Sequence, residues 1–384
     1  MFSRRTEWNL TPNRLTHAHQ EALASGKKII DLTLSNPTNV DIKYDESAIL
    51  KALANPRALD YDPQPKGLRS AREAVSQYYG SAVDPEFLIL TTSTSEGYSF
   101  VFRLLCNPGD EILVPKPSYP LFDFLAELQD VSLVPYSLIY DHGWQIDFHS
   151  LENAITPKSR GVVLVHPNNP TGSYVSAQES EHLNELCGRD KLALIVDEVF
   201  VDYAHQKPKP TFAANHDTLT FTLSGISKVS ALPQMKLAWI AVSGPPAEVA
   251  AAMQRLEIVA DTYLSLNAPV QLAAPVLLDQ RETIQPQLMS RVRANLSELD
   301  RQLALQKSCS RLDVQGGWYA VLRIPVTRSD EDFVIELLRR SGVLVHPGHF
   351  YDFPTDGYLV LSLIAIKEDF GAGVAAALQF ASVL

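Results

Sequence analysis

The chain alternates short apolar runs with amphipathic stretches, and this alternation constrains its fold more than any other feature. The apolar runs span residues 87–91, 111–114, 131–135, 161–165, 192–196, 219–223 and 237–242. Unbroken apolar runs between helical patterns are typical of strands in a mostly parallel sheet, because helices cover both faces of such a sheet. The pattern predicts an α/β fold with a three-layer α/β/α domain around a mostly parallel, seven-stranded sheet.

A second, smaller unit follows. Helical patterns separate the seven runs at 67–79, 96–106, 119–129, 176–187 and 246–259. A longer one covers 271–307, where Pro275 and Pro286 must break or kink it, so it is expected to connect two domains. Beyond it, strand-like runs at 318–324, 343–346 and 358–364 alternate with helical patterns at 330–341 and 368–382. We expect a large domain of residues 51–285, a small α+β domain of residues 286–384, and a segment of residues 1–50 that packs with the small domain.

Charge and cysteine content narrow the class of ligand. The 384 residues carry 33 Lys and Arg against 44 Asp and Glu, a net charge of −11. A surface of that sign repels phosphate backbones and anionic lipid, so we expect no nucleic acid and no membrane partner, and a small molecule as ligand. Cys106, Cys187 and Cys309 lie far apart, which suits neither a disulfide framework nor a paired-cysteine zinc site. A cytoplasmic location and no targeting segment are expected.

Two ionisable residues follow the ends of apolar runs. Ser227 and Lys228 come after the run 219–223, and Asp197 comes after 192–196. Since open α/β sheets bind ligands at the carboxyl ends of their strands, the amine and the carboxylate are expected at one ligand-binding edge. The plainer interpretations are a solvated surface lysine and a structural ion pair, because an unpaired buried carboxylate is strongly disfavoured.

Two polar segments end at the same predicted edge. The turn His-Pro-Asn-Asn-Pro-Thr-Gly at 166–172 follows one apolar run and presents asparagine side chains. Ser93, Thr94 and Ser95 end another run and begin a helix, with Ser93 and Glu96 at the spacing of a capping box. Backbone N–H groups and small hydroxyls at a helix start suit a phosphate, although helix capping alone would explain the same residues.

Asn-Asn-Pro-Thr-Gly at 168–172, Asp197 and Ser-Lys at 227–228, in this order and spacing, resemble the fold type I pyridoxal-phosphate enzymes, specifically the class I and II aminotransferases. The resemblance runs from about Asp31 to about Leu363. It implies pyridoxal 5′-phosphate as cofactor. Lys228 would form the Schiff base with the cofactor aldehyde and later move the substrate α-proton. Asp197 would keep the pyridine nitrogen protonated, so that the ring accepts electrons.

The resemblance implies further contacts to the cofactor. Asn169 would donate to the ring 3-oxygen, and Tyr119 would stack on the ring face. Tyr61 is similar to the family tyrosine that reaches the phosphate of the neighbouring subunit, which implies a homodimer. The phosphate would lie among the hydroxyls of Ser93, Thr94, Ser95 and Ser227.

Three positions depart from the family pattern. Lys236 stands where the family usually has a phosphate-binding arginine, which keeps the charge but loses the bidentate fork. Phe200 stands where the family has a tyrosine, so one hydrogen bond to the ring 3-oxygen is missing. Val360 stands where the family has the arginine that pairs with the substrate α-carboxylate, and a valine cannot bind a carboxylate.

Two consequences of Val360 stay open. Arg323 is a possible replacement cation, although it also fits an exposed strand position, and Asn36 in the N-terminal substrate loop could bind part of the substrate. Alternatively, the substrate has no carboxylate at that place. His346 and His349 are three residues apart, but with no further ligand nearby we expect no metal site.

The predicted activity is that of a pyridoxal-phosphate-dependent aminotransferase, which moves an amino group from an amino donor to a 2-oxo acid by a ping-pong mechanism. The alternatives on the same fold are a carbon–sulfur β-lyase and a decarboxylase. A ligand-sensing module of a transcription regulator is disfavoured because residues 1–50 show no clear helix-turn-helix. A lysine-dependent aldolase on a (β/α)₈ barrel would leave the Asn-Pro-Thr-Gly turn without a purpose.

Overall fold

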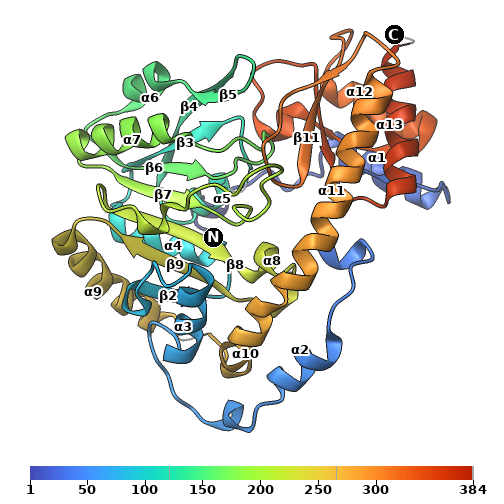
Figure 1. The fold of residues 1–384 in the computed structure, drawn as a ribbon. Helices are drawn as coiled ribbons and strands as arrows, with labels where there is room; N and C mark the ends of the chain where they lie inside the picture. The colour runs from blue at the N-terminus through green and yellow to red at the C-terminus, as the bar shows by residue number, and fades with distance from the viewer. Residues whose placement is uncertain (121, 265, 383–384) are drawn as a thin grey trace.

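The computed structural model describes residues 1–120, 122–264 and 266–382. Its large sheet has eight strands (Figure 1). In spatial order they are β2 (Leu88–Thr91), β9 (Ala238–Ser243), β8 (Thr220–Gly225), β7 (Ala193–Asp197), β6 (Ser159–Val165), β3 (Glu111–Lys116), β4 (Ser132–Tyr140) and β5 (Trp144–Ile146). The five neighbouring strands from β8 to β4 are parallel to one another. Strand β9 is antiparallel to both of its neighbours, and β5 is antiparallel to β4.

The predicted mostly parallel sheet is confirmed, with one strand more than expected. Each of the seven apolar runs forms a strand. The eighth, β5, has three residues with one buried side chain, which is too short to show a period in the sequence. It pairs with the end of β4 as a hairpin at the sheet edge.

Helices cover both faces of the large sheet. One face packs against α4 (Thr94–Leu105), α5 (Phe122–Glu127) and α9 (Pro246–Thr262). The other face packs against α2 (Glu46–Leu53), α3 (Arg69–Tyr78) and α10 (Ala268–Asp279) at one end, and α6 (Phe148–Ala154) and α7 (Ala177–Asp190) at the other. Successive residues of β9 alternate between the faces: Trp239 lies with α3 and α10, and Ile240 with α4 and α9. The three predicted layers result from this alternation.

The small sheet is antiparallel. Its order is β10 (Ser310–Arg311), β11 (Tyr319–Arg323), β14 (Tyr358–Ser362) and β13 (His346–Pro347). The helices beside it are α11 (Arg281–Leu303), α12 (Asp330–Ser341) and α13 (Lys367–Ser382), drawn together at the right of Figure 1. The helical region 271–307 breaks at Gln280, between α10 and α11, whereas Pro275 and Pro286 lie inside these helices. Tertiary packing along α10 compensates for the hydrogen bond that a proline removes.

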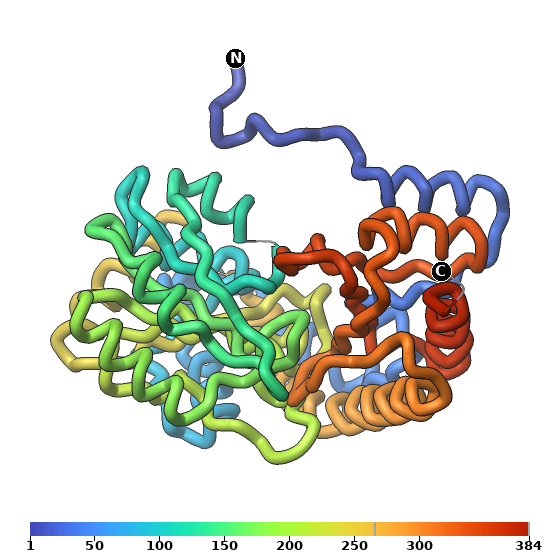
Figure 2. The backbone as a smooth tube through the Cα atoms, turned by 90° about the horizontal axis from the view of Figure 1, so that it is seen from above, coloured from blue at the N-terminus to red at the C-terminus, as the bar shows by residue number. Residues whose placement is uncertain are grey.

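The N-terminal segment touches both halves of the molecule. Its strand β1 (Ile30–Asp31) pairs in parallel with β12 (Val343–Leu344), and its helix α1 (Arg14–Ala24) packs against α12. Figure 2 shows the first residues extending from α1 toward the side of the large sheet. There Arg5 pairs with Asp130, and the Trp8 ring meets the Phe124 ring edge-on at 5.5 Å between centroids. None of the helices in the described part of the chain is long and apolar enough to cross a membrane.

Candidate active site

Lys228 lies at the carboxyl end of β8. The strand is buried along its whole length and ends at Gly225, after which the four-residue helix α8 (Ile226–Val229) carries the lysine. The amine Nζ lies 3.4 Å from the backbone oxygen of Ser35, and 5.5 and 5.0 Å from the ring centroids of Phe200 and Trp318. Burial lowers the pKa of Lys228 to about 8, against the opposing charge of Asp197. The amine is thus easier to deprotonate than an exposed lysine.

Asp197 is the last residue of β7, next to β8. Its Oδ2 accepts a hydrogen bond from the Tyr98 hydroxyl at 3.2 Å, and its Oδ1 accepts one from the Val199 N–H at 3.1 Å. Burial raises the pKa of Asp197 to about 6, which the hydrogen bonds and the Lys228 charge partly oppose. Within the described residues no Lys, Arg or His lies at ion-pair distance from this carboxylate, so the structural ion pair considered from the sequence is not present.

The turn after β6 uses its two asparagines differently. Asn168 is engaged: its Oδ1 accepts from the Ser118 hydroxyl at 3.1 Å, and its Nδ2 donates to Pro117 O and Thr171 Oγ1. The buried Oδ1 of Asn169 has no partner among the described residues. A buried amide atom without a partner costs about 1 to 3 kcal/mol, so the position favours a ligand, and the two amide orientations present either a donor or an acceptor there.

The start of α4 is capped as the sequence predicts. The Ser93 side chain accepts from the Glu96 N–H at 3.2 Å, while Glu96 Oε2 accepts from the Thr92 N–H at 2.6 Å. Thr94 and Ser95 follow in the first turn and are half-buried. Capping and anion binding are compatible, because an acceptor hydroxyl still has its own proton to donate.

Lys236 and Ser227 lie close to each other in space. The Ile226 N–H donates to the backbone oxygen of Leu237 at 3.0 Å. Because Lys236 precedes Leu237, this hydrogen bond brings the Lys236 backbone to the start of α8. Lys236 adopts a left-handed conformation with φ 55° and is exposed. Ser227 is half-buried one residue before Lys228.

Tyr119 lies at the mouth of the site. Its side chain is 43% exposed, and its pKa is raised by partial burial and by the nearby charge of Asp197. The loop that carries it is tied to the Asn168 turn through Ser118. The structure therefore brings Tyr119, Asp197, Asn169 and Lys228 to one edge of the sheet.

Three further residues predicted from the sequence lie at different distances from Lys228. Asn36 caps the 3₁₀ helix η2 (Pro37–Asn39) and follows Ser35, whose backbone oxygen lies beside the Lys228 amine. Tyr61 is 85% exposed on a surface loop. Arg323 is the exposed last residue of β11, with its guanidinium 3.4 Å from the Tyr358 hydroxyl. At about 3.3 Å per residue it is roughly 16 Å along the strand from Trp318, so the structure does not bring Arg323 to the lysine.

The structure also shows site residues that the sequence did not single out. Trp318 is fully buried with its ring over Lys228, and its indole N–H has no partner among the described residues. Tyr98 binds Asp197, and the Tyr203 hydroxyl donates to Lys228 O at 2.6 Å. All three look like ordinary core aromatics in the sequence, because periodicity identifies a buried face and not the group that it meets.

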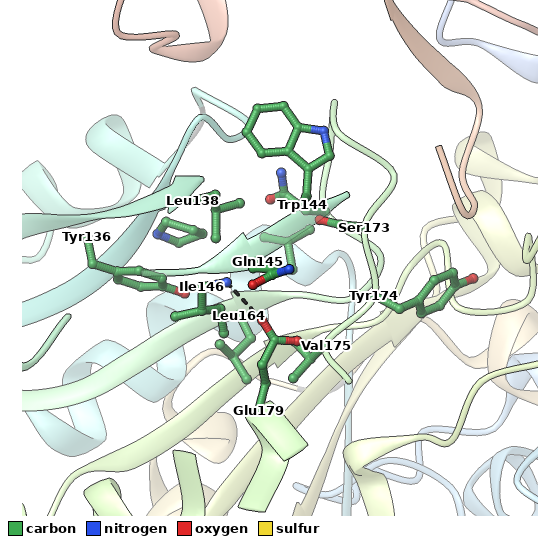
Figure 3. A pocket seen from close by; sticks show the side chains of 13 residues that line it. Tyr136, Leu138, Trp144, Gln145, Ile146, Leu164, Ser173, Tyr174, Val175 and Glu179 are labelled. Carbon is green, nitrogen blue, oxygen red and sulfur yellow. Dashed lines mark hydrogen bonds between the residues drawn. The ribbon is translucent and has the colours of Figure 1, made fainter. Parts of the chain in front are cut away.

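A small cavity lies behind the Asn168 turn. Figure 3 shows Tyr136, Trp144 and Glu179 among its lining side chains, with Glu179 accepting from the Ile146 N–H at 2.8 Å. Its volume of about 20 Å³ accommodates about one water molecule, so it is not a substrate site. Within the described ranges, no group of three or more His, Cys, Asp or Glu side chains is arranged to hold a metal.

The donor set at this edge fits pyridoxal phosphate. A carboxylate and an amine of complementary charge lie at adjacent strand ends, and a partly exposed aromatic side chain stands at the entrance. The unsatisfied amide of Asn169 offers a hydrogen bond to a ring substituent, and the N-terminus of α4 offers N–H and hydroxyl groups to a phosphate.

Comparisons with known proteins identify the family of the chain. The family model described as "Aminotransferase class I and II" matches residues 27–363. The chain is 28% identical to the glutamate-pyruvate aminotransferase AlaA of Haemophilus influenzae over 369 residues, 91% of each chain. It is 28% identical to the alanine aminotransferase of Mycobacterium tuberculosis over 378 residues, 93% of this chain and 87% of that one.

Solved structures show the same fold. An alanine aminotransferase from Pyrococcus furiosus superposes with a TM-score of 0.90 at 22% identity, covering 100% of both chains. An aminotransferase from Escherichia coli gives a TM-score of 0.86 at 25% identity, covering 100% of this chain and 98% of that one. These relatives do not favour the lyase and decarboxylase alternatives. Because the family model covers most of its length, this chain belongs to the class I and II aminotransferases, whose members depend on pyridoxal phosphate, and it is a transaminase that moves an amino group from an amino donor to a 2-oxo acid.

Proposed function

We propose that Lys228, Asp197, Asn169 and Tyr119 are the cofactor-binding and catalytic residues of this transaminase. The observation that carries the proposal is the pair of half-buried ionisable groups at neighbouring strand ends, an amine with pKa about 8 and a carboxylate with pKa about 6. Strongly perturbed groups of this kind concentrate at active sites. Pyridoxal phosphate, when bound, supplies an aldehyde that condenses with amines and a ring that withdraws electrons from the substrate carbon.

Each side chain has a distinct part. The Lys228 amine takes the proton from the amino-bearing carbon of the donor and, in the second half-reaction, gives a proton to the carbonyl carbon of the 2-oxo acid, since its lowered pKa suits both directions near neutral pH. Asp197, oriented by Tyr98 and the Val199 N–H, places its negative charge at the base of the site. The rings of Phe200 and Trp318 pack against the amine.

The phosphate is assigned to the start of α4. Ser93, Thr94 and Ser95 offer hydroxyls and free first-turn N–H groups, and Ser227 and Lys236 lie together at the start of α8. Tyr61 is assigned to the phosphate of a second subunit in a homodimer. Its 85% exposure in the single chain supports this role, because the side chain has no buried environment within its own subunit.

We propose an amino acid as donor and a small 2-oxo acid as acceptor. Two relatives are named for reactions of alanine or of glutamate with pyruvate, and these are the substrates to test first. The division into domains of residues 51–285 and 286–384 stays a prediction, as does a cytoplasmic location, which three unpaired cysteines support.

The test is the visible absorption of the protein loaded with cofactor. Adding L-alanine or L-glutamate without an acceptor should bleach the cofactor band, and adding pyruvate or 2-oxoglutarate should restore it. Release of ammonia and a 2-oxo acid without any acceptor would instead establish a lyase. A band that no amino acid bleaches would contradict the proposed donors.

A further inference from the structure

The small sheet turns one face toward the large domain. Residues directly opposite each other on antiparallel strands project to the same face. Val360 on β14 lies opposite Val321 on β11 and opposite His346 on β13, and Tyr319 lies opposite Ser362. The side chains of these five residues therefore share one face of the sheet.

This face borders the candidate site. The Ser118 N–H donates to the backbone oxygen of Tyr351 at 2.9 Å, which fixes Tyr351 beside the Tyr119 loop. Burial raises the pKa of Tyr319 and of Tyr351, and in both cases the neighbouring Tyr119 adds to the rise. The hydroxyl of Ser362 donates to Leu34 O, one residue before the backbone oxygen that meets Lys228.

Two residues of this face can carry a positive charge. Arg323 lies opposite Tyr358 at the exposed end of the strands, two positions beyond Val360 in the direction away from Ser362. His346 lies directly beside Val360, and its Nδ1 is 3.0 Å from the Tyr351 hydroxyl. Of the two, only His346 is held among residues that border the site.

We propose that His346, oriented by Tyr351, binds the carboxylate of the amino-acid substrate. This inference rests on the proposed transamination of amino acids and names the group that recognises their carboxylate in a chain with Val360 at the corresponding strand position. A hydrogen-bonded Nδ1 fixes the ring, and Nε2 remains as the donor to an anion. Tyr119 at the mouth of the site supplies a neighbouring hydroxyl.

His346 is suited to gain its positive charge only when an anion binds. Burial lowers its pKa, and the carboxylate of Asp31 on β1 partly opposes the shift. In the empty site the ring is therefore largely neutral near pH 7, so no charge is left uncompensated. An incoming carboxylate favours the imidazolium and forms a charge-assisted hydrogen bond with it.

The first experiment measures binding without catalysis. Propionate and propionamide are titrated into the protein while the imidazole NMR signals are followed, with the signal of His346 identified by its loss in His346→Gln. We expect propionate to shift this signal and the uncharged amide to leave it unchanged. An unchanged His346 signal at saturating propionate would overturn the proposal.

The second experiment measures recognition during the half-reaction with L-alanine. We expect His346→Gln to raise the alanine concentration for half-maximal bleaching by roughly tenfold or more, the size of a lost hydrogen bond to a charged group. The matched control is His349→Gln, the same change at an exposed histidine on η7 (Gly348–Tyr351), and it should change this concentration less than twofold.

Other outcomes would overturn the inference. A large effect of Arg323→Gln with none of His346→Gln would assign the carboxylate to Arg323. Bleaching by isopropylamine as effective as bleaching by L-alanine would show that the site has no carboxylate subsite. Failure of every amino acid to bleach the band would contradict the proposed function, and the propionate titration would still test His346 separately.

Discussion

The pKa of Glu198 allows a quantitative prediction of how the stability of the protein depends on pH. It follows Asp197 directly and is fully buried, with Oε2 accepting from the Thr211 hydroxyl and Oε1 from the Phe212 N–H, both at 2.6 Å. Burial raises its pKa from 4.5 to about 8, although both hydrogen bonds oppose the shift. Near pH 7 the folded protein therefore holds a proton on Glu198 that the unfolded chain releases.

The sign and size of the effect follow from this proton. A carboxyl group with a raised folded pKa favours folding fully below its unfolded pKa, and this contribution is lost as the pH rises through the folded pKa. Each pH unit between about 4.5 and 8 costs up to about 1.4 kcal/mol, so the free energy of unfolding falls by roughly 5 kcal/mol over the whole titration. Glu198→Gln keeps an acceptor for Phe212 and removes the titration.

We therefore expect Glu198→Gln to match the wild type near pH 5 and to exceed it by a few kcal/mol at pH 8. The assay is urea unfolding of both proteins at pH 5, 6, 7 and 8, followed by fluorescence, with the difference between them read at each pH. Glu185→Gln, at an exposed position on α7, is the matched control and should run parallel to the wild type. Parallel curves for Glu198→Gln, or a variant less stable than wild type at pH 8, would refute the reasoning.

Three further predictions concern the proposed catalytic groups. Lys228→Ala should abolish transamination while circular dichroism shows an unchanged fold, and near-normal turnover would contradict its role. Asn169→Ala should weaken cofactor binding by several-fold to tenfold in an equilibrium titration, since one buried hydrogen bond is worth about 1 kcal/mol, and unchanged affinity would exclude contact with the cofactor. Tyr98→Phe removes a hydrogen bond that lowers the pKa of Asp197, so the acidic limb of kcat/KM should move to higher pH, and an unmoved limb would show that Asp197 does not control it.

The sequence predicts the large sheet and its ligand edge because both leave local signals. Seven apolar runs form seven strands, and α12 occupies the predicted residues 330–341. Asp197 stands out because a charged residue directly after a fully apolar run is unusual, and Lys228 follows the end of the neighbouring strand within five residues. Strands of a parallel sheet have their carboxyl ends at one edge, which places both residues there. The hydrophobic pattern contains this information without any knowledge of tertiary contacts.

The parts that the sequence does not predict depend on register and distance. Arg323 lies on the expected strand, but alternation reveals only which face a residue occupies and not how far along the strand the site lies. The position of His346 beside Val360 follows from the pairing of β13 with β14, which no local pattern encodes. The contact of Trp8 with α5 joins segments more than a hundred residues apart, so it has no sequence signal either.

Burial shifts the pKa values of both proposed catalytic groups, and it shifts them in opposite directions. It lowers the pKa of Lys228 from 10.5 to about 8, so the fraction of free amine at pH 7 is larger by two to three orders of magnitude than for an exposed lysine, roughly tenfold per unit. The same burial raises the pKa of Asp197 only to about 6, because Tyr98, the Val199 N–H and the Lys228 charge oppose it. At pH 7 the carboxylate is therefore still charged while the amine is accessible to deprotonation. Glu198 is fully buried, and the charges of Asp202 and Asp197 add to the rise of its pKa to about 8, so it stays protonated at pH 7. Both its depth and its neighbours therefore separate it from Asp197 and Lys228, which are half-buried.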